Sequence, residues 1–320
     1  MFSIARGTVF AGTFLVAFLS QNGTAPFSGR AEAQQAINSL SGVTLFFEGS
    51  IIRSRLNLVR KSGLRRGTEK VADPADQEIS VTVIPVAFNY GLYRNLTLGL
   101  VVPYVAHKRL RSIEDGQRRT RSSSGLGDIL VGGKWRILKR DAYRRTLQAA
   151  VVFNVKLPTG SDETRFESQL LPPPLQVGTG SVDYLFAFGA TQILGRAALH
   201  VSAAYKLNTE GGQEYAFGDV FSYNAVANHR IWHTPFPGPE LGIGVELNGA
   251  LAREDTQRGN ALDHTGGHTI FLSPDLFFVA RPNLSLELSV QIPVFQDLNG
   301  TQLGSKWRGV AGLRYQYAWF

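Results

Sequence analysis

His200 and Ser202 are the strongest candidates for catalysis in this sequence. A histidine that hydrogen-bonds a serine hydroxyl can remove its proton and make it a nucleophile, which would suit the cleavage of an ester. The two residues alternate with Leu199, Val201 and Tyr205, so in a strand they would lie on the polar face, away from lipid. We therefore interpret them as two polar side chains and keep a lipid-modifying enzyme as an alternative hypothesis.

The histidines are spaced poorly for binding a metal. His229 and His233 are four residues apart, a spacing that suits a helix but spans about 13 Å on a strand. His264 and His268 lie where a loop meets a strand, with Asp263 as the one acidic neighbour. The chain has no cysteine, which excludes a thiolate site and a disulfide. We predict that the protein binds no metal and no cofactor.

Short glycine motifs do not complete a nucleotide-binding site either. Residues 132–135, Gly-Gly-Lys-Trp, lack the leading glycine and the final serine or threonine of a phosphate-binding loop. Residues 125–127, Gly-Leu-Gly, are followed by Leu130 where a dinucleotide-binding turn needs its third glycine. Neither H-E-x-x-H nor G-x-S-x-G occurs in the sequence. We therefore predict that the protein is not an enzyme.

The elements that position these residues follow from an alternation with a period of two. Every even position of residues 284–294 is apolar, whereas Ser285, Glu287, Ser289 and Gln291 are polar. Such a segment is typical of a β-strand with one apolar and one polar face. The same pattern predicts twelve strands, at about 43–57, 77–91, 95–108, 126–138, 144–158, 180–194, 196–208, 218–233, 239–253, 267–280, 283–296 and 306–320.

The connections between these strands alternate in length. Bacterial outer-membrane barrels combine short periplasmic turns with longer external loops. No segment with a helical period covers the apolar faces, so we expect lipid to cover them. We predict an all-β fold, a transmembrane antiparallel up-and-down β-barrel in the outer membrane of a Gram-negative bacterium. Long connections are expected at roughly 58–76, 109–125, 159–179, 209–217, 254–266 and 297–305.

The first 33 residues have the features of a secretory signal peptide. Arg6 precedes an apolar core at 9–19, which is too short to span a bilayer as a helix. Residues 31–33, Ala-Glu-Ala, form a cleavage site before Gln34. We predict a cleaved signal peptide at 1–33, a short segment at 34–42 and the barrel at 43–320.

Charged residues on the inner faces of the strands are candidates for lining a pore. Eight strands leave no channel and 16–18 leave a wide one, so twelve predict a narrow pore partly filled by side chains. Each residue either lines a path for solutes or belongs to a network that fills the interior. The candidates are Lys134, Arg136, Lys156, Asp183, Lys206, Arg230, Glu246, Asp275, Glu287, Arg308 and Arg314.

Two loops, around 60–70 and 108–121, are rich in arginine and lysine. Export separates the protein from nucleic acid, so we expect these loops to contact phosphorylated headgroups of outer-membrane lipids and lipopolysaccharide. The last strand carries aromatic residues in alternation, and the chain ends at Phe320. This ending resembles the signal by which the barrel assembly machinery binds outer-membrane proteins.

Six short phrases share their order and spacing with one family. They are Gly-Leu-Gly-Asp at 125–128, Lys-Leu-Pro-Thr-Gly at 156–160, Gly-Thr-Gly-Ser-Val-Asp-Tyr at 178–184, Gly-Asp-Val-Phe-Ser-Tyr at 218–223, His-Thr-Ile-Phe-Leu-Ser-Pro at 268–274 and Pro-Val-Phe-Gln-Asp-Leu-Asn-Gly at 293–300. Over about residues 77–320 the chain resembles the outer-membrane transporter family named for the MetA pathway of phenol degradation. The resemblance implies passage of aromatic or other small molecules and assigns no catalytic residue.

The functional prediction is an outer-membrane, porin-like channel or facilitator for small solutes, with aromatic or hydrophobic molecules as candidates. Two alternatives stay open. One is a lipid-modifying enzyme that uses His200 and Ser202, and the other is a closed structural barrel whose external loops bind a partner.

Overall fold

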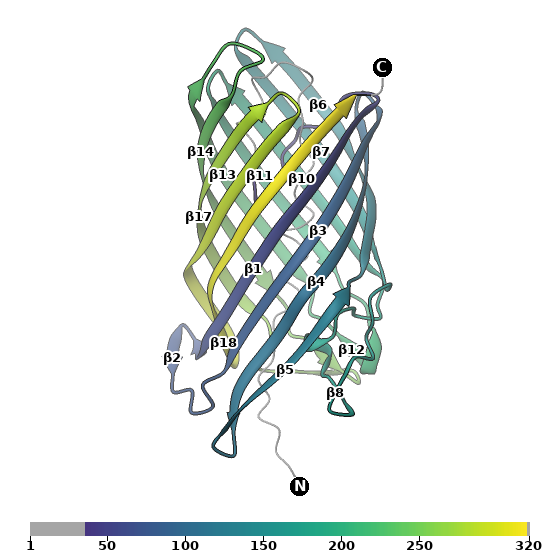
Figure 1. Cartoon of the computed structure of the whole chain (residues 1–320), viewed down its shortest axis with the longest axis vertical. Helices are drawn as coiled ribbons and strands as arrows, with labels where there is room; N and C mark the ends of the chain where they lie inside the picture. The colour runs from purple at the N-terminus through teal and green to yellow at the C-terminus, as the bar shows by residue number, and fades with distance from the viewer. Residues whose placement is uncertain (1–35, 319–320) are drawn as a thin grey trace.

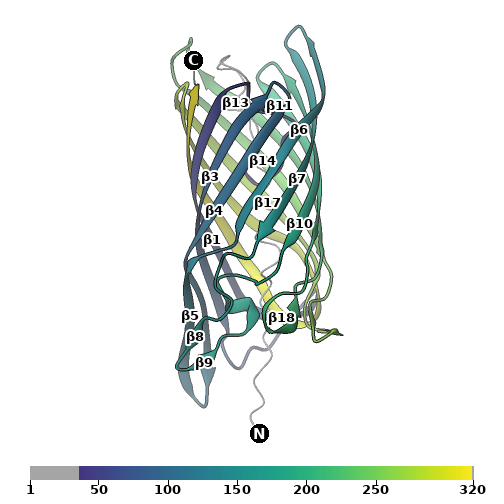
Figure 2. The same cartoon turned by 90° about the vertical axis from the view of Figure 1, so that its right-hand side faces the viewer.

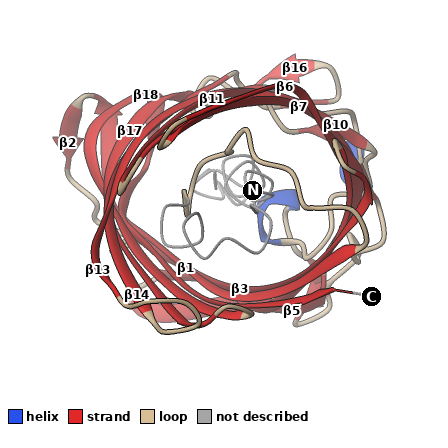
Figure 3. Cartoon of the chain, turned by 90° about the horizontal axis from the view of Figure 1, so that it is seen from above, coloured by secondary structure: helices blue, strands red, loops and turns tan. Residues whose placement is uncertain are grey.

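Strands that follow one another along the chain pair side by side and in antiparallel register until the sheet closes on itself (Figure 1). The computed structural model describes residues 36–318. Seen from above, the strands form a ring with loop segments inside it (Figure 3). The ring follows β1 (Gly49–Gly67), β3 (Glu78–Tyr93), β4 (Leu96–Glu114), β6 (Ile129–Ala142), β7 (Arg145–Leu157), β10 (Asp183–Leu194), β11 (Ala197–Leu207), β13 (Val220–His233), β14 (Glu240–Ala252), β17 (Gly267–Arg281) and β18 (Leu284–Ala318), which pairs with β1.

The element β18 folds back on itself and contributes two arms to the ring. Its 35 residues would extend about 115 Å as one straight strand. Instead, its first arm pairs with β17 and its second arm pairs with β1. The backbone nitrogen of Gln316 donates to the carbonyl of Asn283 at 2.8 Å, so the two arms lie side by side. With both arms of β18 counted, the described residues contribute twelve antiparallel strands to the barrel wall. The predicted fold class is therefore confirmed.

The remaining short elements lie at the end of the barrel that carries the long connections (Figures 1 and 2). The strand β5 (Gln117–Leu126) forms a hairpin with β4, which is its one partner among the described strands. None of the helices in the described part of the chain is long and apolar enough to cross a membrane. The other short elements are β2 (Glu69–Val71), β8 (Arg165–Phe166), β9 (Gln169–Leu170), η2 (Pro173–Leu175), η3 (Gly212–Glu214), β12 (Tyr215–Ala216), β15 (Thr256–Gln257) and β16 (Asn260–Ala261).

Three predicted boundaries were wrong. The first strand is Gly49–Gly67, not 43–57. The predicted loop at 109–125 is the distal part of the β4–β5 hairpin, where both faces are polar and the alternation gives no signal. The predicted loop at 297–305 is strand instead, because both arms of β18 run through it and the chain reverses direction near Asn299–Gly300, where glycine adopts the positive φ of +52° without strain.

The apolar faces of the strands point outward and the polar faces point inward. Along the first arm of β18, Leu286, Leu288, Val290, Ile292 and Val294 keep 42–56% of their surface exposed. The alternating polar residues Glu287, Ser289 and Gln291 are buried inside the ring. An outward apolar band around a polar interior is the arrangement that a lipid bilayer requires of a barrel.

Candidate functional site: the polar lumen and the chain inside it

The segment of residues 36–48, which we call the luminal strap, lies inside the barrel, and its residues 36–45 are buried. It forms no strand, and the wall holds its backbone through side chains. The backbone nitrogens of Ile37 and Asn38 donate to the carboxylate of Glu246 at 2.6 and 3.0 Å. Further along, Gly42 donates to Thr191 Oγ1 at 2.9 Å. Residues 43–48, predicted as strand, therefore belong to this luminal strap.

Two glycines allow the luminal strap to lie against the wall. A Cβ at Gly91 would come within 1.8 Å of the carbonyl oxygen of Phe46, and a Cβ at Gly42 within 2.3 Å of that of Gln148. Backbone approaches of this kind exclude any side chain, so only glycine fits. At its end the luminal strap turns into β1, where the backbone nitrogen of Glu48 donates to the carbonyl of Gly91 at 2.8 Å.

A buried ion cluster joins β18 to β1 across the closure of the barrel. Arg55 Nε lies 2.5 Å from Glu287 Oε1, and Arg53 Nε lies 3.7 Å from the same oxygen. Arg55 Nη1 also donates to the carbonyl of Ile37 in the luminal strap at 2.9 Å. Arg314, buried on the second arm of β18, donates to Ser285 Oγ at 3.1 Å. This cluster therefore ties the closing strands and the luminal strap together.

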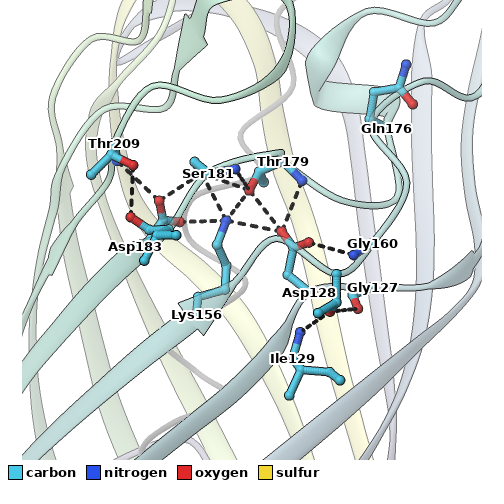
Figure 4. A network of polar contacts seen from close by, with 12 residues as sticks. Gly127, Asp128, Ile129, Lys156, Gly160, Gln176, Thr179, Ser181, Asp183 and Thr209 are labelled. Atoms are coloured by element: carbon cyan, nitrogen blue, oxygen red, sulfur yellow. Dashed lines mark hydrogen bonds and ion pairs between the residues drawn. The ribbon is translucent and has the colours of Figure 1, made fainter.

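A second ion cluster lies at the long-loop end of the lumen (Figure 4). Lys156 Nζ lies 3.1 Å from Asp128 Oδ2 and 2.9 Å from Asp183 Oδ2, and Lys206 Nζ lies 3.1 Å from Asp183 Oδ2. Asp128 also accepts hydrogen bonds from the backbone nitrogens of Gly160 and Thr179 at 2.9 and 3.0 Å. The cluster thus fixes both ends of the connection between β7 and β10.

The connection between β7 and β10 covers an apolar patch on the inner wall. Leu171, Leu175 and Val177 of the connection pack against buried residues of the wall at this end. Lys108 Nζ and Ser123 Oγ donate to the carbonyls of Gln176 and Leu175 at 2.6 and 2.5 Å. The wall residues of this apolar patch are Val59, Ile79, Val81, Val83, Val105 and Leu303.

A third ion cluster lies near the short-turn end. Arg230 Nη1 lies 3.2 Å from the carboxylate of Glu240, and His233 Nδ1 lies 2.9 Å from the same carboxylate. Arg136 on β6 does not contact this cluster among the described interactions, and it donates to the carbonyl of Arg94 at 2.6 Å. The fully buried Lys134 reaches Ser41 of the luminal strap at 3.5 Å.

The two remaining candidates lie apart from the three clusters. The guanidinium of Arg308 lies over the ring of Phe271, 4.1 Å from its centroid. Asp275 is buried on β17, where it interacts with Glu246 on β14 and with Ser289 on the first arm of β18. Seven of the eleven predicted lumen residues thus contact an oppositely charged group or the luminal strap: Lys134, Lys156, Asp183, Lys206, Arg230, Glu246 and Glu287. Whether any of them lines a path for solutes stays a prediction.

Three groups of residues were missed by sequence reasoning. The first strand was too weakly defined to place Arg53 and Arg55, although they alternate with Ile52, Ser54 and Leu56. Asp128 ends the Gly-Leu-Gly-Asp segment at 125–128, which indicated the family but predicted no role for the carboxylate. The luminal strap has no local signal, because the residues that hold it come from strands far along the chain.

Among the hydrogen bonds described for residues 36–318, none joins His200 to Ser202. His200 Nδ1 pairs with Thr191 Oγ1 at 2.8 Å, and Ser202 Oγ accepts from Asn224 at 3.1 Å. Both residues are buried on the inner face, with 2% and 7% of their surface exposed. A lipid ester in the bilayer would therefore meet Leu199 and Val201 rather than this pair.

The remaining histidine candidates have other partners. His268 Nε2 lies 2.8 Å from the hydroxyl of Tyr223, and His233 pairs with Glu240. Among residues 36–318, no group of three or more histidine, aspartate or glutamate side chains is arranged to hold a metal ion.

A closed antiparallel ring with an apolar outer band and a charged lumen defines a transmembrane β-barrel of the outer-membrane class. The chain belongs to the family described as the MetA pathway of phenol degradation, which matches residues 77–297. An outer membrane channel from Pseudomonas putida F1 has the same fold, with a TM-score of 0.64 and 16% identity over 86% of this chain and 97% of its own. The β domain of the Bordetella autotransporter BrkA is less similar, with a TM-score of 0.46 and 8% identity over 84% of this chain and 99% of its own. No curated protein matches the chain.

Proposed function

We propose that the protein is a channel that carries small aromatic or hydrophobic solutes across the outer membrane. The observation that carries this proposal is how the lumen is filled. A polar lumen is occupied by residues 36–45 of the luminal strap, which form no strand, and by the connection between β7 and β10. Chain held by side-chain hydrogen bonds can move without breaking the sheet, so the barrel wall stays intact when the lumen opens.

Two further observations support this choice of solute. The name of the family refers to phenol degradation, and the similar structure from Pseudomonas putida is named a channel. The apolar patch beneath Leu171, Leu175 and Val177 offers a surface with which an aromatic solute can make apolar contacts as it passes through a polar lumen.

Planar-bilayer conductance and liposome uptake of phenol test the proposal. The purified protein is compared with a variant that lacks residues 36–47 of the luminal strap, because the remaining ring elements begin at Gly49. We expect conductance steps and phenol uptake that increase in the deletion variant. Silence in both proteins would overturn the channel and favour the closed structural barrel.

The enzyme hypothesis has its own test. Phospholipid hydrolysis that disappears in Ser202→Ala would overturn our proposal, because Ser202 would then be a nucleophile. Hydrolysis that persists at the same rate in Ser202→Ala, or is absent in both proteins, is the expected result.

We also propose that the β4–β5 hairpin contacts phosphorylated headgroups of the outer leaflet. Arg118 and Arg119 are exposed at its distal part, on a hairpin that projects beyond the neighbouring strands (Figure 1). Guanidinium groups pair with phosphate in bidentate geometry. Charge reversal of both arginines should lower the lipopolysaccharide retained during purification. Phe320, which we expect to contact the barrel assembly machinery, and the signal peptide at 1–33 lie outside the described residues.

A further inference from the structure

Two cations of the inner wall share one small cavity. It lies where β17, the two arms of β18 and β1 run side by side, and it has room for about one water molecule. Among the described residues that line it, the charged ones are Lys61 on β1 and Arg308 on the second arm of β18. Lys61 has only 3% of its surface exposed. Like charges repel strongly where little water screens them, so an anion in this cavity would stabilise both cations.

A β-bulge turns Arg308 toward the cavity. The partners of Ser305 and Trp307 on β1 are consecutive residues, so Lys306 is the extra residue of β18 at this point. Without the bulge, residues three apart on a strand would point to opposite faces. With it, Ser305 and Arg308 both line the cavity. Bulges often redirect a side chain next to a functional site, and here the bulge brings a guanidinium into the lumen.

Hydroxyl groups complete the lining of the cavity. Thr269 on β17 and Ser305 lie beside the two cations. The side-chain amide of Gln296 donates to the carbonyl of Ser305 at 3.1 Å and accepts from its backbone nitrogen at 2.7 Å, so it ties the two arms of β18 together. An ammonium group, a guanidinium group and two hydroxyl groups can all donate hydrogen bonds, which is the set that suits the oxygens of a carboxylate.

One acidic residue acts on this site from outside the cavity. Asp255, in the loop that follows β14, interacts electrostatically with Lys61. Its carboxyl also accepts hydrogen bonds from the hydroxyl of Tyr215 and, at 2.8 Å, from the backbone nitrogen of Gly218. A single carboxyl balances at most one of the two cations. The cavity therefore keeps a positive charge.

The apolar patch of the inner wall borders the cavity. Leu303 belongs to both, because it lines the cavity and packs within the patch. Two other residues of the patch are strand partners of the cations, since Val59 pairs with Arg308 and Ile79 pairs with Lys61. A small molecule with an anionic group between the cations would therefore reach the patch with its apolar part.

We infer that Lys61 and Arg308 form a binding site for the carboxylate of an aromatic acid, whose ring lies against the apolar patch. The ring takes the place of Leu171, Leu175 and Val177, the side chains of the connection between β7 and β10 that cover the patch. This inference rests on the proposed channel and narrows its solutes to those that carry an acidic group. It also gives the two cations a role that a neutral solute would not require.

Ligand-observed fluorine NMR of the purified protein in detergent tests the inference. The probe is para-fluorobenzoate, and para-fluorobenzyl alcohol is its neutral counterpart. Lys61→Gln and Arg308→Gln each remove one cation from the cavity. Lys306→Gln removes an exposed cation from the same arm of β18 and is the matched control. Electrophoretic mobility before and after heating verifies that every variant is folded.

We expect the wild type to bind the acid about tenfold more tightly than the alcohol, because hydrogen bonds to a charged group are stronger than neutral ones. Each of the two glutamine variants in the cavity should lose about this factor for the acid and bind the alcohol as before. The control Lys306→Gln should bind both probes like the wild type. Lys61→Arg keeps the positive charge and should keep the preference for the acid.

Three results would overturn the inference. Equal binding of the acid and the alcohol by the wild type is the first, and it needs no variant. A preference for the acid that persists in both Lys61→Gln and Arg308→Gln would place the carboxylate elsewhere. Displacement of the probe by an equal concentration of acetate would show an anion site without a place for the ring.

Binding in detergent is measured apart from transport, so the inference and the proposed channel can fail separately. Conductance and phenol uptake without binding of the acid would overturn the inference and leave the channel in place. Binding of the acid by a protein that is silent in bilayers would overturn the channel and leave the site in place.

Discussion

The carboxylate of Glu246 lies 2.6 Å from the backbone nitrogen of Ile37, although 209 residues separate them in the sequence. Asn248 Nδ2 donates to the same carboxylate at 3.0 Å, which orients it toward the luminal strap. One acidic residue of the wall thus accepts hydrogen bonds from two consecutive backbone nitrogens. This contact holds the first described residues of the chain against the inner face of the wall.

The substitution Glu246→Gln should loosen the luminal strap. Glutamine keeps the shape of the side chain but replaces one acceptor oxygen by a donor, so one buried N–H group loses its partner at a cost of about 1–3 kcal/mol. We expect a larger mean conductance in planar bilayers and an intact barrel. Glu69→Gln, at an exposed position of β2, is the control that should leave conductance unchanged. Equal conductance in both variants would contradict the role of Glu246.

The substitution Glu287→Gln should destabilise the barrel at its closure. It leaves Arg53 and Arg55 buried without their anion, and breaking a buried pair in this way costs about 3–5 kcal/mol. The temperature at which the folded band disappears in detergent electrophoresis should fall. Asp76→Asn breaks the exposed pair with Arg118, so it should shift this temperature little. A fall of the same size in both variants would refute the structural role of the cluster.

The substitution Leu288→Arg should impair insertion into the membrane. Leu288 has 51% of its surface exposed in the outward apolar band, and an arginine on the lipid face near the midplane costs about 2–4 kcal/mol. The yield of heat-modifiable barrel folded into lipid vesicles should therefore drop. Leu288→Phe keeps the position apolar and should fold normally. Normal insertion of the arginine variant would show that this face does not meet lipid.

Asp255, whose carboxyl contacts Tyr215 and Gly218 in the loops, should stabilise the folded protein less as the pH rises. Burial raises the pKa of this carboxyl, although the backbone nitrogen of Gly218 donates to it at 2.8 Å. The protonated carboxyl of Asp255 contributes to the free energy of unfolding. This contribution is fully present below the pKa of about 3.9 in the unfolded chain and is lost as the pH rises through the higher pKa of the folded state. The midpoint of thermal unfolding for Asp255→Asn, minus that of the wild type, should therefore increase between about pH 3 and pH 7. If the difference between the two unfolding midpoints instead decreased over this pH range, the raised pKa of Asp255 would be contradicted.

Local alternation was sufficient to predict the direction of most side chains. Glu287 is buried and Leu288 exposed, as their odd and even positions require, because successive side chains of a strand point to opposite faces. The same rule placed Lys156, Asp183 and Lys206 on the inner side. The alternation did not predict that the chain reverses at Asn299–Gly300. An Asn-Gly dipeptide favours a hairpin turn, so this reversal could have been recognised from the sequence.

The sequence by itself determined the class of the protein, because a period of two and an uncovered apolar face are properties of each strand alone. The tertiary structure decided which inward charges meet. Arg55 contacts Glu287, 232 residues away in the sequence. The contact forms because the second arm of β18 pairs with β1 and lies beside the first arm, which carries Glu287. Likewise, no local pattern predicts that Ile37 lies at Glu246, since the luminal strap is held by wall residues that come together only when the ring closes.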